Sequence, residues 1–207
     1  GERVLTFYDP DGLKLELVAS PEADPALAWA GGPVPQEYAL RGFYGVTLEV
    51  AALEPTAAVL RDLLGLSSAG SDGGRFRFRS APEGPGSVVD IALPKLTVPG
   101  RVSAGTVHHV AWRVADEQAQ LRALEEIRLL GLPASGVIDR YYFRSVYFRE
   151  PGGVLFELAT DGPGFTVDQP PEELGTRLVL PPFLEPRRAE IEARLPKVRL
   201  PEVRPTN

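Results

Sequence analysis

The residues of this chain best suited to metal chemistry are two histidines and a glutamate in its second half. His108 and His109 are the chain's only histidines, and they lie in the segment 107–114, where apolar and polar residues alternate. Because strand side chains point alternately to opposite faces, His109 lies on the polar face of the strand predicted here. The same parity in two later predicted strands places Tyr147 and Glu157 on the side of His109, if the three strands line one curved sheet. An imidazole and a carboxylate facing one cavity suggest a metal site.

A helix predicted between these strands would cover the apolar side of that sheet. It runs from about residue 117 to residue 130, with Asp116 as its N-cap and Gly131 as its C-terminal signal. Its predicted inner face consists of three apolar residues at helical spacing, Leu121, Leu124 and Ile127.

The strand and helix pattern is repeated along the chain. Residues 44–50 align without a gap on residues 108–114, and residues 7–17 align in the same way on residues 148–158. Repeats of this kind reveal architecture, and they predict the end of one module followed by two complete modules. Each complete module reads strand, helix, then two or three strands, over about 50 residues.

This repeat divides the chain into five segments. They are the end of an upstream module (1–19), a linker (20–41), a module without a metal histidine (42–95), the metal-site module (105–160) and a proline-rich C-terminal tail with a short helix (161–207). In the middle module Asp90 takes the place of Glu157, but Gly45 stands where the last module has His109.

Composition excludes several classes of partner. The chain has 207 residues, 43% of them hydrophobic, which is enough for one sizeable core or two small ones. Its net charge of −6 argues against nucleic acid or an anionic membrane, and favours small molecules. No apolar run approaches the roughly 20 residues that cross a bilayer. The absence of cysteine excludes disulfides and thiolate metal sites, and fits a cytoplasmic protein.

Four motifs give the chain a family resemblance. They are His108-His109-Val-Ala-Trp, Asp139-Arg-Tyr-Tyr-Phe-Arg-Ser-Val-Tyr147-Phe, Glu150-Pro-Gly-Gly-Val-Leu-Phe-Glu157 and the tail Leu180-Pro-Pro-Phe-Leu-Glu-Pro-Arg-Arg. Together they resemble the hydroquinone-type ring-cleaving dioxygenases of the vicinal oxygen chelate superfamily, to which glyoxalase I and the fosfomycin- and bleomycin-resistance proteins also belong. The superfamily resemblance covers about residues 1–160. It implies an α+β fold in which repeated βαβββ modules form curved, half-open barrels of mixed β-sheet.

The resemblance also implies a chemistry. It is the Fe(II)-dependent insertion of both oxygen atoms of O2 into a hydroquinone- or catechol-like aromatic diol, with Mn(II), Zn(II) or Ni(II) left open as the metal. By motif, His109 and Glu157 would be two of three metal ligands. Tyr147 would hydrogen-bond or exchange a proton with a substrate oxygen, Arg140 would stabilise developing negative charge, and His108 would act as an acid or base. Strict alternation opposes His108, which faces the other way unless the strand loosens at its start.

Plainer interpretations of the same residues stay open. His109 could be a hydrogen-bonded polar residue on a strand, Glu157 a surface residue of a half-buried sheet, and Tyr147 a packing residue. The function could also be that of a glyoxalase-like isomerase or lyase with another divalent ion, or of a metal-free small-molecule-binding protein. A homo-oligomer is left open.

A third ligand is missing from the predicted site. Neighbouring strand residues cannot both point at one metal, so His108 cannot complete the set. The resemblance implies that the remaining histidine lies in an opening module. We therefore expect about 100 further residues upstream of Gly1, with a His-Val strand near their start. We also expect this chain alone to retain metal weakly and to be inactive.

Overall fold

The computed structural model of the chain describes residues 2–21, 23–82, 84, 86–94, 100 and 102–198. The chain opens with an antiparallel hairpin of β1 (Arg3–Tyr8) and β2 (Lys14–Ala19). Two short 3₁₀ helices, Pro25–Leu27 and Gln36–Tyr38, follow within the predicted linker.

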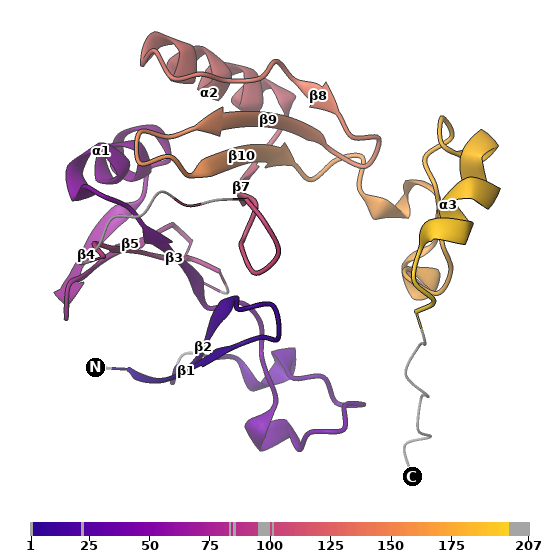
Figure 1. Cartoon of the computed structure of the whole chain (residues 1–207), viewed down its shortest axis with the longest axis horizontal. Coiled ribbons are helices and arrows are strands. Elements are labelled where there is room, and N and C mark those ends of the chain that lie inside the picture. The colour runs from indigo at the N-terminus through magenta and orange to yellow at the C-terminus, as the bar shows by residue number, and fades with distance from the viewer. Residues whose placement is uncertain are drawn as a thin grey trace.

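Two βαβββ modules come next (Figure 1). The middle module consists of β3 (Gly45–Glu49), α1 (Leu53–Ala58), β4 (Ser67–Asp72), β5 (Arg75–Arg79) and β6 (Val88–Ala92). One π-helical turn, Val59–Leu63, continues α1. The last module consists of β7 (Val110–Val114), α2 (Glu117–Leu129), β8 (Ile138–Asp139), β9 (Arg144–Arg149) and β10 (Leu155–Thr160). Each module therefore has three strands after its helix.

The two four-stranded sheets have the same topology. Their orders are β3-β6-β5-β4 and β7-β10-β9-β8. The first two strands of each order, β3 with β6 and β7 with β10, run parallel, and the other neighbouring pairs are antiparallel. The register is also the same, because Asp90 lies opposite Thr47 and Glu157 lies opposite Ala111. These mixed, unclosed sheets are the fold that the family resemblance implies.

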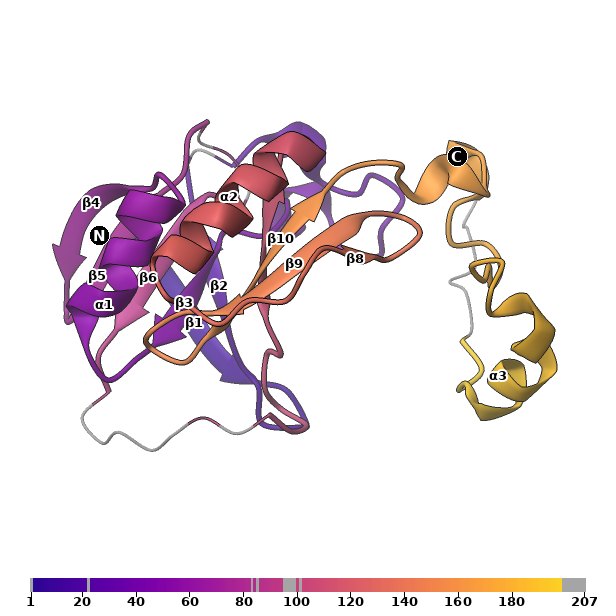
Figure 2. The same cartoon turned by 90° about the horizontal axis from the view of Figure 1, so that it is seen from above.

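One hydrophobic core joins both modules. Leu60 and Ile91 of the middle module belong to the same buried cluster as Ile127, Phe148 and Phe156 of the last module. Burial of side chains of this size contributes roughly 1.5–3 kcal/mol each. The π-helical turn that extends α1 packs against α2, and the two helices lie side by side in Figure 2. This core fixes the position of β7, β9 and β10.

The helix α2 agrees with its predicted limits but not with its predicted inner face. The Asp116 carboxylate accepts a hydrogen bond from the Ala119 amide at 2.7 Å, as expected of an N-cap. Leu124 and Ile127 are buried, whereas Leu121 is 54% exposed and its neighbour Gln120 is fully buried. The prediction for Leu121 was wrong because the helix turns a polar side chain toward the sheet. Gln120 Nε2 donates to the carbonyls of Arg144 and Leu158 at 2.8 Å each.

The C-terminal segment stands apart from the two sheets in both views (Figures 1 and 2). It contains three 3₁₀ helices and α3, which are Phe165–Val167, Pro171–Glu173, Glu185–Arg187 and Arg188–Arg194. The end of the predicted tail, 199–207, lies outside the described residues. Among the residues that are described, no helix is long and apolar enough to cross a membrane.

Candidate metal centre

His109 and Glu157 face each other on the side of the last sheet opposite its core. Glu157 comes from the middle of β10 and is 3% exposed, while the His109 side chain, just before β7, is 34% exposed. The distance between His109 Nε2 and Glu157 Oε2 is 2.7 Å. The structure thus brings together the imidazole and the carboxylate that strand parity placed on one side.

This pair fits a divalent metal ion. Imidazole nitrogen and carboxylate oxygen bind such ions at about 2.1 Å, so two ligands at adjacent octahedral positions lie about 3.0 Å apart. The observed 2.7 Å is close to that separation, and it also matches a hydrogen bond in which the imidazole Nε2–H donates to the carboxylate.

His108 lies beside His109 rather than on the opposite face. Regular pairing of β7 begins at Val110, so the backbone at both histidines is free of the strand geometry that would separate them. The two Nδ1 atoms are 2.9 Å apart, and the rings meet edge to face. One Nδ1 must donate and the other accept. If His109 Nδ1 donates to His108, then His109 Nε2 carries the free lone pair that a metal ligand needs.

Tyr147 and Arg140 complete the polar surroundings of His109. Tyr147 lies on β9 directly opposite Glu157, and its ring meets the His109 ring edge to face at 5.7 Å. Arg140 Nη2 donates to Tyr147 Oη at 3.3 Å, and its guanidinium lies over the Tyr147 ring at 5.3 Å from the centroid. Arg140 is exposed, so its charge is available to a ligand in front of Tyr147.

Ser145 is a residue of the site that the sequence did not single out. It lies two residues before Tyr147 on β9, is fully buried, and donates a hydrogen bond to Glu157 Oε1. The signal that could have found it is the strand parity that placed Tyr147 beside Glu157.

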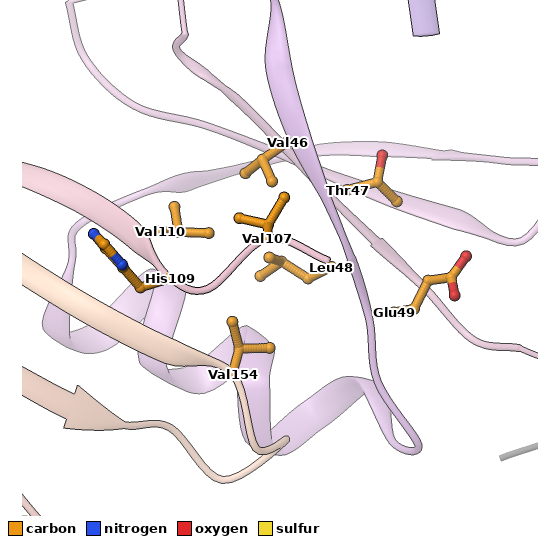
Figure 3. A pocket seen from close by; sticks show the side chains of 8 residues that line it. All are labelled: Val46, Thr47, Leu48, Glu49, Val107, His109, Val110 and Val154. Carbon is orange, nitrogen blue, oxygen red and sulfur yellow. The ribbon is translucent and has the colours of Figure 1, made fainter. Parts of the chain in front are cut away.

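An apolar pocket of about 160 Å³ lies next to His109, between β3 and the start of β7 (Figure 3). Five apolar side chains line it, those of Val46, Leu48, Val107, Val110 and Val154. His109 lies at its edge and so has an apolar surface on one side. A second pocket, of about 510 Å³, lies at the N-terminus of α2 and is lined by Asp116, Asp139 and Arg144, but by none of the predicted site residues.

Known proteins resemble this chain along nearly its whole length. MhqO of Bacillus subtilis, a protein assigned as a ring-cleaving dioxygenase, is 42% identical over 192 residues, which cover 93% of this chain and 61% of MhqO. The chlorohydroquinone/hydroquinone 1,2-dioxygenase of Sphingobium indicum is 34% identical over 195 residues, 92% of this chain and 60% of that enzyme. A crystal structure of a Bacillus subtilis protein described as a dioxygenase superposes with a TM-score of 0.83 at 42% identity, covering 99% of this chain and 64% of that protein.

The chain is similar over nearly its whole length to proteins named as dioxygenases, and its βαβββ modules with mixed, unclosed sheets have the fold that the family resemblance implies. It spans less than two thirds of the length of the relatives it matches. No family model matches it.

In the middle module, the acid at the position of Glu157 is Asp90, and an arginine of the same module pairs with it. Asp90 is 4% exposed, and Arg77 donates two hydrogen bonds to its carboxylate, from Nε at 2.8 Å and from Nη2 at 2.9 Å. The hydrogen bonds to Asp90 raise the pKa of Arg77 above the ordinary value of an arginine. Its guanidinium therefore stays charged. Arg75 Nε lies 3.9 Å from Asp90, and Arg75 Nη2 reaches Glu16 of the hairpin at 2.8 Å.

Glu2 extends this network to the start of the chain. It accepts hydrogen bonds from Arg77 Nη1 at 2.8 and 2.9 Å, and from the Tyr44 hydroxyl. Burial tends to raise the pKa of Glu2, but the hydrogen bonds from Tyr44 and Arg77 outweigh it and hold the pKa below its usual range. Burial and the contact with Glu2 together raise the pKa of Tyr44.

His109 and Glu157 are the two candidate ligands that the structure brings together within the described part of the chain. No group of three or more histidine, cysteine, aspartate or glutamate side chains that could hold a metal ion occurs among those residues. The roles of His108, His109, Arg140, Tyr147 and Glu157 stay predictions that this geometry accommodates.

Proposed function

We propose that the full-length protein to which this chain belongs is an Fe(II)-dependent, extradiol-type ring-cleaving dioxygenase. Its substrates would be O2 and a hydroquinone- or catechol-like aromatic diol, and both oxygen atoms would enter the product. The observation that carries this proposal is the His109 Nε2 to Glu157 Oε2 contact of 2.7 Å, in a chain that is 34–42% identical to proteins named as dioxygenases.

The site supports this chemistry because it offers separate groups for the metal ion and for the substrate. His109 and Glu157 would hold the metal ion, which when bound would supply the redox chemistry that lets O2 react with an aromatic ring. Neither residue need change protonation during the reaction once the ion is held. The apolar pocket beside His109 would limit the access of water to this side of the site.

Tyr147 and Arg140 would act on the substrate. The Tyr147 hydroxyl already accepts a hydrogen bond from Arg140, so its own proton is free to be donated to a diol oxygen or returned from it. A neighbouring guanidinium stabilises the negative charge that develops on that oxygen. His108 accepts or donates at Nδ1 toward His109, which suits it to hold the tautomer of His109 as well as to move a proton.

Reconstitution of the full-length gene product tests this proposal. The protein is freed of metal, loaded anaerobically with Fe(II), and mixed with O2 and hydroquinone, chlorohydroquinone or catechol. We expect stoichiometric O2 uptake and loss of the aromatic absorbance. No uptake with any diol, together with tight binding of Zn(II) or Ni(II), would instead support a glyoxalase-like isomerase. A protein that retains no metal would support a binding protein.

A further inference from the structure

We propose that Ser145 is a positioning residue that holds Glu157 in a single orientation, with Oε1 fixed and Oε2 alone presented to His109 and the metal ion. This inference rests on the proposed function, because it assumes that Glu157 is a metal ligand. It concerns a residue that touches neither substrate nor metal and acts through Glu157.

The two oxygens of Glu157 have separate partners. The buried Ser145 hydroxyl donates to Oε1, and His109 Nε2 lies 2.7 Å from Oε2. A carboxylate can bind a metal through one oxygen or through both, and the number it uses decides how many positions remain open. A donor on Oε1 disfavours its use as a ligand. Glu157 would therefore occupy one position, which leaves more of the metal open to substrate and O2.

The location of Ser145 is itself fixed by the sheet and by α2. Ser145 lies opposite Ala159, two residues along the register from the Tyr147–Glu157 pair and therefore on the same face, so its short side chain reaches the carboxylate diagonally. Gln120 Nε2 donates to the carbonyls of Arg144 and Leu158, which are the residues next to Ser145 and Glu157 in the chain. This buried side chain ties the two strands together where the pair forms.

A purely structural explanation is that the Ser145 hydroxyl only supplies a hydrogen bond that the buried Glu157 carboxylate needs. A second pair in the chain shows what that role looks like. Thr56 Oγ1 donates to Glu150 Oε2 at 2.7 Å, and the amides of Gly152 and Val154 also donate to this carboxylate. Glu150 therefore has three donors and both oxygens filled. Among the described residues, Glu157 has a hydroxyl on one oxygen and the imidazole alone on the other.

The matched variants are Ser145→Ala and Thr56→Val in the full-length gene product. Each removes one buried hydroxyl that donates to one buried glutamate. The metal-free proteins are titrated with Mn(II), and the free ion is followed by electron paramagnetic resonance. We expect Ser145→Ala to weaken Mn(II) binding by about 10-fold or more, as is typical when a group that orients a ligand is removed. Thr56→Val should lower the melting temperature while leaving the Mn(II) dissociation constant unchanged.

Ser145→Thr separates the hydroxyl from the shape of the side chain. It keeps the donor, so its Mn(II) affinity should lie much closer to the wild-type value than that of Ser145→Ala. The Mn(II) spectrum of Ser145→Ala should also change, because the carboxylate can turn or bind through both oxygens.

Failure of this inference is distinguishable from failure of the proposed function. If wild type binds Mn(II) and, with Fe(II), consumes O2, but Ser145→Ala binds Mn(II) as tightly, only the role of Ser145 is overturned. Equal weakening by Ser145→Ala and Thr56→Val would overturn it too, because loss of stability would then explain both. If wild type binds no Mn(II), the metal function and the role of Ser145 fall together.

Discussion

The middle and last modules place a buried acid at the same point of the same sheet and surround it differently. Asp90 lies opposite Thr47 on the first strand of its module, and Glu157 lies opposite Ala111. The neighbouring antiparallel strand presents Arg77 to Asp90 but Tyr147 to Glu157. Since topology and register agree around the two acids, the contrast beside them is one of side chains.

One scaffold can thus hold either a closed ion pair or an open site. A buried carboxylate needs a compensating charge. In the middle module Arg77 supplies it in a bidentate contact, with Arg75 nearby, and Glu2 and Glu16 continue the network into the hairpin. In the last module the partners of Glu157 are a hydroxyl and an imidazole. Neither is a permanent cation, so the carboxylate can serve a metal ion.

Gly45 adds a steric reason for the closed site. A Cβ atom at position 45 would lie 2.3 Å from the carbonyl oxygen of Val88, so no histidine fits there without a backbone shift. Pairing of β3 includes Gly45, whereas pairing of β7 begins only at Val110. The looser start of β7 gives His109 the space that Gly45 lacks.

Removal of the acid should affect metal binding in the last module and leave it unchanged in the middle module. Glu157→Gln keeps the shape of the side chain but removes the ligand charge. We expect Mn(II) binding to the full-length protein to weaken by at least about 100-fold, more than for a residue that only orients a ligand, and Fe(II)-dependent O2 uptake to disappear. Asp90→Asn, the matched variant, should retain both. Retention of metal by Glu157→Gln would refute the ligand role.

The tyrosine that replaces arginine beside the acid should matter for turnover rather than for metal binding. Tyr147→Phe removes the hydroxyl that would exchange a proton with the diol, and we expect kcat to fall by about 100-fold at unchanged Mn(II) affinity. Tyr142→Phe is its control, because the Tyr142 hydroxyl donates to Asp168 at 2.9 Å and not to a candidate site residue. Equal rates for wild type and Tyr147→Phe would remove this residue from the chemistry.

The ion pair of the middle module should contribute stability. Asp90→Asn leaves Arg77 without its buried partner, and we expect the free energy of unfolding in urea to fall by about 2 kcal/mol, less than for a fully buried pair because Arg77 is partly exposed. Asp161→Asn breaks the exposed pair with Arg113 and should cost little. An unchanged stability for Asp90→Asn would mean that the network is incidental.

The smallest expected effect is the pH dependence that Glu2 confers. Its pKa in the folded protein lies below the ordinary 4.5, so ionised Glu2 stabilises the fold above that value, and the contribution is lost as pH falls through the folded-state pKa. At neutral pH, Glu2→Gln should be less stable than wild type by less than about 1 kcal/mol. Urea unfolding should show this difference shrink in acid. A difference that persists unchanged would assign it to something other than charge.

Strand parity and the repeat predicted much of this site. They placed His109, Tyr147 and Glu157 on one side, and the structure brings these three together because β7, β9 and β10 are neighbours in one sheet. Parity failed at His108, since alternation holds only within a regular strand and β7 starts two residues later. The end of regular pairing depends on tertiary packing, which the sequence does not reveal.

Other features had no clear local signal. The strand β4 has the sequence Ser-Ser-Ala-Gly-Ser-Asp and is exposed throughout, so it lacks the apolar alternation that marks a strand. Gln120 is polar, and periodicity assigned the inner face of α2 to Leu121 instead. Its burial follows from two carbonyl partners on β9 and β10, contacts that exist only after the sheet has formed.

The most direct test is a crystal structure of the full-length protein loaded anaerobically with Fe(II), with data collected at the iron absorption edge. We predict one anomalous peak per chain, bound by His109 Nε2 and Glu157 Oε2, and none at Asp90. A peak beside Asp90, or iron bound without contact to His109 and Glu157, would contradict the account.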